Sequence, residues 1–481
     1  MRGMMKKLRG AVIGSAMLLA GCVAMDVGPI NTQTHLPQPP SPEFFPDSGD
    51  DGSTVVGLAF SGGGMRASAF SYGVLRALDD IVVDEKPVRR TLVDDIRMIS
   101  GVSGGAITAA YFGYRGRDNY RDFDERFLRQ NAESSMRTSI SPANLSRAWN
   151  GGVNDLDTFA RWLDENLFNG ATFSSFRWAN APIVWLSASD IYNRTPFLFT
   201  YDTFAALCSD LSALKLSDAV AASAAVPVVF TPVIITAQNP QCAYQHPAWL
   251  KTALRRDNVS LRLQAYAQAL DSYQNKDSLN YVRLMDGGLT DNLGITGFVL
   301  ERAASSTPHG PLSAEEAVRL RNFVLIVADA GRGQTAKWGS TMHGPGMMPL
   351  MGAVVDTGMA SSVRDELDAL NFAVQEWSGK LVQYRCGLPL ATVRKIRGTT
   401  AGWDCRDVHM VVERLAFNDL NPALEAKLNN VPTRLALPAE QIDELVEAGR
   451  ETVATSRIIQ EVVSGIWPKG APRPDVQLTN D

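Results

Sequence analysis

The sequence predicts an α/β fold with a central, mostly parallel sheet and a C-terminal helical region that extends it. The apolar run 54–60 and the run that contains Ile96, Met98 and Ile99 each lead into a glycine-rich turn and then a helix-forming stretch. Short continuous apolar runs rich in β-branched residues are typical of strands buried in a parallel sheet. Toward the C-terminus helical patterns follow around 354–377 and 439–467, which predicts a mostly helical region.

The first glycine turn follows the strand predicted at 54–60 and reads Gly62, Gly63, Gly64, Met65, Arg66. A turn between a strand and a helix points backbone N–H groups at a place where an anion can bind. The N–H groups of Gly63 and Gly64 are therefore candidate donors to a developing oxyanion. Arg66 would add positive charge, or alternatively pair with a structural carboxylate.

A second interpretation of this turn is dinucleotide binding, because Gly62, Gly64 and Ala67 fit the G-x-G-x-x-G/A fingerprint and Asp84 follows at a suitable distance. Two features weigh against it. The first residues of the chain, described below, have the layout of an export signal, and reduced nicotinamide cofactors are scarce outside the cytoplasm. A second strand, turn and helix with a central serine also follows closely.

That second turn, from Gly101 to Gly105, has the G-x-S-x-G spacing of a nucleophile elbow, with Ser103 at its centre. Small neighbours let a strained backbone lift the serine Oγ into the open, at a helix N-terminus that favours negative charge. A serine in an ordinary glycine-rich turn is the plainer alternative. The choice between the two depends on the rest of the chain.

Further strands are predicted at 183–190, 281–285 and 323–330. The strand at 281–285 ends in Asp286, Gly287 and Gly288, a combination that alone indicates only a tight turn. Between these strands the sequence predicts helical segments within 146–168, a small-residue helix at 221–227 stopped by proline, and one helix over 248–272. The apolar segment 347–351 is a loop or helix start that either packs in the core or touches a membrane.

The first residues have the layout of a bacterial secretory signal, with basic residues followed by an apolar run at 11–20 that is too short to span a bilayer comfortably. The run ends at Leu19, Ala20, Gly21 and Cys22, which resembles the lipobox of bacterial lipoproteins. We expect a signal peptide at 1–21, a lipid on Cys22 and a proline-rich flexible tether over 22–53. Because Val23 rather than aspartate follows the cysteine, we expect the periplasmic face of the outer membrane rather than the inner membrane.

The formal net charge of −5 over 481 residues, with no long run of one sign, argues against a nucleic-acid partner. Apart from Cys22 the chain has four cysteines. In an exported protein they predict two disulfides, Cys208 with Cys242 and Cys386 with Cys405. Metal binding is less favoured, because no cysteine pair has C-x-x-C spacing and the nearest histidines are isolated. We expect no metal and no cofactor.

Taken in order, the glycine loop 62–66, the elbow 101–105 and the turn 286–288 resemble the signatures of the patatin-like phospholipase family. The resemblance covers roughly 55–292 and includes the small-residue and proline segment from Ser223 to Pro232. Ala67 departs from it, because the family usually has glycine after the arginine. The long stretch from Pro232 to Asp286 is a second departure and leaves the shape of the substrate cleft open.

The resemblance implies a three-layer α/β/α catalytic domain, which we set at 54–335. From the sequence beyond it we expect a mostly helical region at 336–467 that packs on the core, and a disordered tail at 468–481. The resemblance also implies hydrolysis of phospholipid or another lipid ester. Ser103 would be the nucleophile, Asp286 the base, and Gly62, Gly63, Gly64 and Arg66 the oxyanion hole. None of the five histidines lies in a matching motif, so we expect a dyad without histidine. The alternative is a catalytically silent, membrane-anchored lipoprotein that acts as a binding or assembly module.

Overall fold

A computed structural model describes residues 25–35, 51–85, 89–176, 181–237, 241–255, 259–275, 277–333, 342 and 344–465. The predicted signal peptide, Cys22 and the predicted tail at 468–481 lie outside these residues. None of the helices in the described ranges is both long enough and apolar enough to cross a membrane.

A single large sheet forms the centre of the molecule, in the strand order β12-β11-β1-β4-β6-β10-β9, with β7 paired to β6. The five strands from β12 to β6 are mutually parallel, and β10 and β7 run antiparallel to β6. This confirms the predicted α/β class with a mostly parallel sheet. The strands are β1 (Thr54–Phe60), β2 (Val82–Asp84), β3 (Arg90–Thr91), β4 (Ile96–Val102), β5 (Gly152–Asn154), β6 (Ile183–Asp190), β7 (Thr195–Leu198), β8 (Val228–Phe230), β9 (Val233–Thr236), β10 (Tyr281–Met285), β11 (Asn322–Asp329) and β12 (His409–Ala416).

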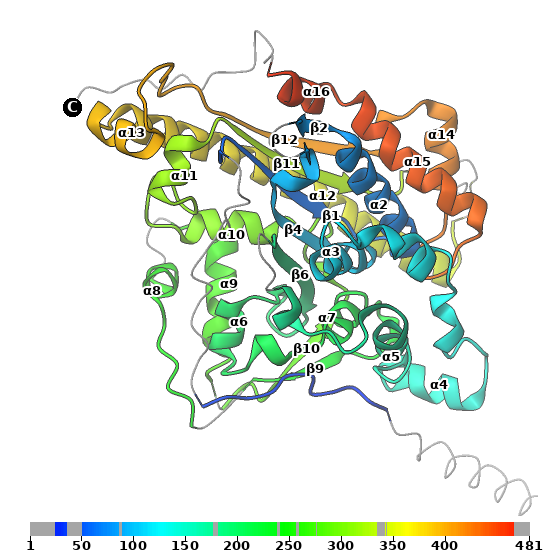
Figure 1. Ribbon diagram of the computed structural model, residues 1–481. Coiled ribbons are helices and arrows are strands. Elements are labelled where there is room, and N and C mark those ends of the chain that lie inside the picture. The colour runs from blue at the N-terminus through cyan, green and yellow to red at the C-terminus, as the bar shows by residue number, and fades with distance from the viewer. Residues whose placement is uncertain are drawn as a thin grey trace, which may run out of the picture.

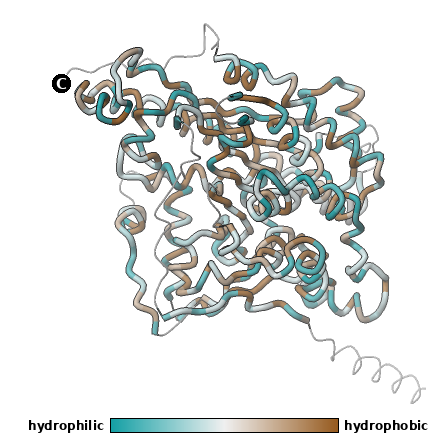
Figure 2. Tube along the Cα trace, in the orientation of Figure 1, coloured by the Kyte–Doolittle hydropathy of each residue, from teal (hydrophilic) through white to brown (hydrophobic). Residues whose placement is uncertain are grey.

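Successive side chains of each central strand point to opposite faces of the sheet, so both faces are apolar. Helices cover both of them. In β1, Val56, Leu58 and Phe60 join the core formed with α2, α3 and α15, whereas Val55 and Ala59 join the core formed with α10 and α12. Figure 1 shows α2, α3 and α15 in front of the sheet and α12 behind it, and Figure 2 shows the hydrophobic stretches gathered along the strands. The helices are α2 (Gly64–Asp80), α3 (Gly104–Arg115), α4 (Pro142–Trp149), α5 (Phe159–Leu163), α6 (Tyr201–Ala206), α7 (Leu216–Ser223), α8 (Ala248–Leu254), α9 (Leu261–Ser272), α10 (Thr296–Ala304), α11 (Ala314–Arg319), α12 (Met347–Cys386), α13 (Leu390–Arg397), α14 (Pro422–Asn429), α15 (Ala439–Thr455) and α16 (Arg457–Ser464).

The C-terminal region does more than pack on the core, because it supplies a strand of the sheet. β12 pairs in parallel with β11 along its whole length, from His409 opposite Asn322 to Ala416 opposite Asp329. The sheet is therefore completed only at residue 416, within the region predicted to be mostly helical at 336–467. The prediction missed β12 because the strand has charged residues, Glu413 and Arg414, in its middle.

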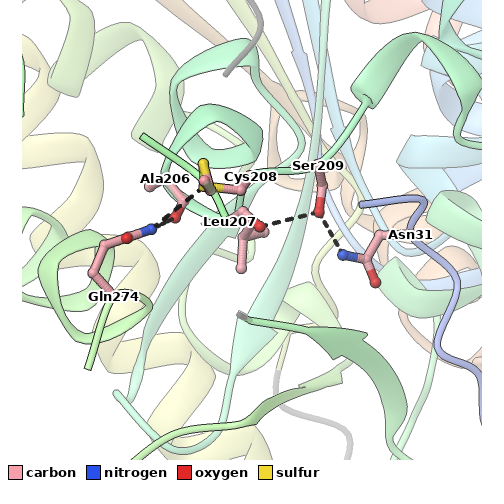
Figure 3. The surroundings of a disulfide bond; sticks show 7 residues. Asn31, Ala206, Leu207, Cys208, Ser209 and Gln274 are labelled. Atoms are coloured by element: carbon pink, nitrogen blue, oxygen red, sulfur yellow. Dashed lines mark hydrogen bonds between the residues drawn. A yellow bond between two sulfur atoms is a disulfide. The ribbon is translucent and has the colours of Figure 1, made fainter. Parts of the chain in front are cut away.

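Residues 25–35, which the composition assigns to a flexible tether, are instead bound along the edge of the domain. Ile30 and Val27 share backbone hydrogen bonds with Ile234 of β9, and Thr34 N–H donates to the carbonyl of Cys208. The Asn31 side chain donates to Ser209 Oγ and to the carbonyl of Thr236. Figure 3 shows Asn31 pointing at Ser209, next to the disulfide at Cys208. We call residues 25–35 the N-terminal strap.

Both predicted disulfides are present in the structure. Cys208 pairs with Cys242 at a Cα–Cα distance of 6.0 Å, and Cys386 pairs with Cys405 at 4.9 Å. The first disulfide lies beside the strap (Figure 3). The second begins at Cys386, the last residue of α12. Both therefore close loops at the periphery of the sheet.

Two helix predictions need correction. The helix expected over 248–272 is two helices, α8 and α9. The N-cap of α9 is Ser260, whose side chain accepts a hydrogen bond from Leu263 N–H and so starts a new helix. The helical pattern at 146–168 contains the strand β5 between α4 and α5. At 347–351 the chain begins α12, and Leu350 is half exposed there.

Candidate active site

Ser103 lies in the turn that joins β4 to α3, as the elbow pattern predicts. It has φ 51° and ψ −119°, a strained conformation for a residue with a side chain, and it is the N-cap of α3. The turn is possible because small residues surround it. A Cβ on Gly105 would lie 2.4 Å from the carbonyl oxygen of Phe60, and one on Gly101 would lie 2.5 Å from the carbonyl oxygen of Gly105.

The structure brings Ser103 and Asp286 together at the carboxyl ends of the sheet strands. The Ser103 side chain hydrogen-bonds the Asp286 carboxylate, whose Oδ1 also accepts the N–H of Gly288 at 2.8 Å. The Asp286 backbone N–H donates to the carbonyl of Ala225 at 2.9 Å, which fixes the residue in place. Two residues that are 183 positions apart in the sequence thus form one hydrogen-bonded pair.

The environment of Asp286 changes its acidity. Ser103 and Asp286 are only 6% and 8% exposed. Burial raises the pKa of Asp286 from 3.8 to about 6, although the hydrogen bonds from Gly288 and Ser103 act in the opposite direction. A carboxylate with a raised pKa is a better proton acceptor than an ordinary aspartate.

The glycine loop after β1 lies directly beside Ser103. A Cβ on Gly62 would be 3.5 Å from the Cβ of Ser103, and one on Gly104 would be 2.0 Å from the carbonyl oxygen of Gly64. Gly63 and Gly64 have φ values of 143° and 61°, which favour glycine. The two glycine turns predicted from the sequence therefore pack backbone against backbone.

The backbone N–H groups of Gly62, Gly63 and Gly64 differ in whether they already donate a hydrogen bond within the protein. Gly62 N–H donates to the carbonyl of Asn292 at 2.9 Å, so it is already paired and cannot act as an oxyanion donor in this arrangement. Within the described residues, no protein acceptor pairs with the N–H of Gly63 or of Gly64. Of the three glycines assigned to the oxyanion hole, these two have donors available.

Arg66 is buried and holds the glycine loop to distant parts of the chain. Its Nε donates to the carbonyl of Ala330 at 2.9 Å, and its Nη1 donates to the carbonyl of Val431 at 2.9 Å and to Thr433 Oγ1 at 3.0 Å. Burial, followed by the charge of Arg332, lowers the pKa of Arg66 to about 10. Arg66 thus stays positive at neutral pH, but its hydrogen bonds are structural rather than directed at a reacting group.

Two further polar residues, Ser223 and Asn292, lie at the site, and neither was predicted from the sequence to be part of it. Ser223 Oγ accepts the N–H of Ser103 at 2.9 Å and donates to the carbonyl of Ser187 at 2.6 Å, so it fixes the elbow to β6. The Oδ1 of Asn292 is buried, has no hydrogen-bond partner among the described residues and would lie 2.6 Å from a Cβ on Gly62. The only sequence signals were their positions, in the small-residue segment and just after the Asp-Gly-Gly turn.

Three histidines of the described part of the chain, His246, His309 and His409, have partners or positions that do not involve Ser103. His246 lies 3.3 Å from Asp271, and His309 Nδ1 contacts the carbonyl of Leu312. His409 begins β12 and therefore lies at the amino ends of the parallel strands, whereas Ser103 follows the carboxyl end of β4. His343 is outside the described residues.

Asp84, the candidate ribose ligand, lies in β2 and pairs with Arg90 at 2.8 Å. The described ranges contain no group of three or more His, Cys, Asp or Glu side chains placed to hold a metal ion.

The long helix α12 reaches the site from the opposite face of the sheet. A Cβ on Gly288 would lie 3.1 Å from the Cε of Met359, and 2.8 Å and 3.0 Å from the side-chain oxygens of Asn292 and Asp286. Further along the helix, Trp377 helps to line an apolar pocket together with Met98, Trp185 and Phe298; Ser103 and Asp286 do not line it. That pocket therefore does not deliver a substrate group directly to the reacting atoms.

Two structures of human GIVD cytosolic phospholipase A2 resemble this chain, with identities of 12% and 13% and TM-scores of 0.38 and 0.36. The second is a complex of the human enzyme with methyl gamma-linolenyl fluorophosphonate inhibitor and terbium chloride. Each match covers 86% of this chain but only 60% and 59% of the human one, so this chain spans about three fifths of that protein. No curated protein matches the chain.

The family comparison is more specific. The model of the patatin-like phospholipase family matches residues 58–299, half of the chain. The match begins in β1, before the glycine loop, and ends in α10, after the Asp286 turn, so it contains Ser103 and Asp286 together. The chain belongs to the patatin-like phospholipase family.

Proposed function

We propose that this protein is a serine hydrolase of lipid esters that acts through a Ser103–Asp286 dyad. The observation that carries the proposal is the hydrogen bond between the Ser103 side chain and a buried carboxylate with a raised pKa, next to two glycine N–H groups that pair with no acceptor in the described residues. A nucleophile, a base and an oxyanion site are the three parts that acyl transfer requires. Family membership supports a lipid ester as the substrate.

In the proposed reaction, Ser103 Oγ attacks the ester carbonyl carbon while its proton passes to Asp286. The N–H groups of Gly63 and Gly64 stabilise the oxyanion. Arg66, which is positively charged, holds the loop that carries them through its hydrogen bonds. Collapse of the tetrahedral intermediate breaks the bond to the alcohol oxygen, which takes the proton from Asp286. Water then attacks the acyl-serine, Asp286 accepts its proton, and the fatty acid leaves as Ser103 Oγ is reprotonated.

The test of this function is turnover of a short-chain nitrophenyl ester by the purified protein. Turnover should be present in the wild type and absent in Ser103→Ala. The alternative is a silent lipoprotein that uses the fold as a binding module. Equal background rates for the two proteins on this ester and on phospholipid would favour that alternative.

Ester hydrolysis should rise with pH and reach half of its upper rate near pH 6. The reason is that only the ionised form of Asp286 can accept the serine proton, and burial raises the pKa of this group to about 6. The profile is measured as kcat/KM on an uncharged ester, which reports the free enzyme. A rate that is flat, or that falls, as the pH rises through this region would contradict the assignment of Asp286 as the base.

We also propose that Cys22 carries a lipid and holds the protein at the periplasmic face of the outer membrane. The basic residues, the apolar run 11–20 and the Leu-Ala-Gly-Cys sequence support this. Replacing Cys22 by alanine should leave an unprocessed or soluble protein with altered mobility and reduced partitioning into detergent. Unchanged processing and partitioning would show that Cys22 is not the anchor.

A further inference from the structure

Helix α4 carries its apolar side chains on the outside. Leu145 and Trp149 are four residues apart, hence on one side of the helix, and are 63% and 91% exposed. On the inner side, Asn144 is buried and donates to Ser139, and Arg147 donates to Asn144. A surface helix of a globular domain normally buries its apolar side chains and exposes the polar ones. The inverted arrangement of α4 leaves an apolar face uncovered by the described part of the chain.

A second group of exposed apolar side chains lies in β8 and just before it. Val226, Val228 and Val229 are exposed, and Val228 has φ 71°, a costly conformation for a β-branched residue. β8 pairs in parallel with β5, the strand that follows α4, with Val228 opposite Gly152. Ile140, two residues before α4, is exposed as well. We call these side chains the apolar rim, which consists of Ile140, Leu145, Trp149, Val226, Val228 and Val229.

The apolar rim adjoins the catalytic pair. The carbonyl of Ala225, the residue before Val226, accepts the backbone N–H of Asp286 at 2.9 Å. Two residues earlier, Ser223 holds the N–H of Ser103. The exposed valines therefore continue directly from the segment that positions both reacting side chains.

The N-terminal strap leads to the apolar rim as well. The N-terminal strap runs beneath β9 toward α5 and α4 (Figure 1), and the carbonyl of Asp26 accepts the N–H of Leu156, two residues after β5. Asp26 N–H also lies 3.3 Å from Asp155 Oδ2. Cys22 is four residues before Asp26, so an extended chain can place it no more than about 14 Å from this point.

We infer that the apolar rim docks on the surface of a lipid bilayer and presents the mouth of the active site to it. This inference rests on the proposed hydrolase function and on the proposed lipid on Cys22. A lipid attached to Cys22 would hold a bilayer within a few residues of the rim, and a lipid ester substrate would come from that same bilayer. A bilayer accounts for the uncovered apolar side chains, for their position beside Asp286 and for the path of the strap.

The first test compares two substrates in variants of the full-length protein. Leu145→Asp combined with Trp149→Asp should lower hydrolysis of phosphatidylethanolamine and phosphatidylglycerol vesicles by about tenfold, because each change removes a side chain that enters the bilayer. Turnover of a dissolved short-chain nitrophenyl ester should stay at the wild-type level. Leu390→Asp is the matched control, since Leu390 is 62% exposed and begins α13, at the opposite corner of the molecule (Figure 1). It should change neither rate.

The second test measures contact directly and does not depend on activity. In the Ser103→Ala protein, vesicles with brominated acyl chains should quench tryptophan fluorescence, and adding Trp149→Phe should remove that quenching. Adding Trp249→Phe should leave it in place, because Trp249 is stacked on Tyr266 away from the rim. This measurement also decides the matter if the double aspartate variant fails to fold and loses both activities.

Equal vesicle hydrolysis in all variants, or no bromine quenching that depends on Trp149, would overturn the bilayer as the occupant and leave a protein partner in its place. A wild type that cleaves neither substrate would instead refute the proposed function. The quenching result would still stand on its own in that case.

Discussion

Replacing Asp286 by asparagine is expected to abolish ester hydrolysis about as completely as replacing Ser103 by alanine, a loss on the order of 10⁴-fold or more. Asparagine keeps the shape and can still accept the N–H of Gly288, but it cannot take a proton from the serine. Because the two residues act as one unit, the double variant should lose little more than either single one. Steady-state rates on the short-chain ester give all three values.

The same variant should be more stable than the wild type above about pH 6. Burial raises the pKa of Asp286 from 3.8 to about 6, so keeping it ionised in the folded chain costs on the order of 3 kcal/mol. The folded chain keeps this proton to a higher pH than the unfolded chain, and the stability therefore falls as the pH rises through that window. Asparagine removes this cost, and thermal unfolding at acidic and at neutral pH should show the gain at neutral pH alone.

The controls for the dyad are the histidines. Replacing His246, His309, His343 or His409 by glutamine should leave turnover within about tenfold, a barrier change of about 1.4 kcal/mol. One inactive histidine variant together with an active Asp286→Asn protein would replace the dyad with an ordinary triad. Loss of both activity and stability in Asp286→Asn would indicate a misfolded protein rather than a missing base.

Gly104→Ala is expected to reduce activity by about 100-fold or more, although the change adds only one methyl group. A Cβ at Gly104 would lie 2.0 Å from the carbonyl oxygen of Gly64. Backbone cannot yield as a flexible side chain can, so the methyl group must push the glycine loop away from the elbow. Displacing the donors of an oxyanion hole costs about 10²–10³ in kcat, and overpacking of this kind costs about 1–3 kcal/mol of stability.

Gly379→Ala is the matched control for this prediction. Gly379 lies inside α12, and a Cβ there would meet nothing within 4 Å. Alanine at this position should leave the rate unchanged and raise stability by about 0.5–1 kcal/mol, because glycine weakens a helix interior. Equal rates for the two variants would mean that the loop and the elbow do not need their close backbone contact.

The centre of the sheet could be predicted from the sequence because its strands are buried on both faces. The apolar runs that become β1, β4, β6 and β11 need no information about their neighbours to be recognised. β12 could not be predicted in the same way, because six of its eight residues are only partly buried. Its charged residue Arg414 is acceptable because it pairs with Asp329 at the end of β11, a contact between distant segments.

The candidate site was predictable to the extent that it depends on backbone shape. Glycine spacing identified the loop, the elbow and the Asp286 turn, which is why Ser103 and Asp286 could be named before their contact was seen. The partners of Gly62 and Arg66 could not be inferred, because they come from Asn292, Ala330 and Val431, far away in the sequence. The exposed face of α4 was likewise hidden, since an apolar helix pattern does not tell which side faces the core.

Arg66 also bears on how this protein is made. The Arg66 guanidinium, which secures the glycine loop, donates to the carbonyl of Val431, 365 positions further along the chain. The N–H of Met65 likewise donates to the carbonyl of Arg434. A nascent chain therefore carries its serine and its aspartate long before the residues that lock the loop have left the ribosome. We expect such a chain to be inert during synthesis, so that the proposed ester hydrolysis begins only after residues 431–434 have joined the fold.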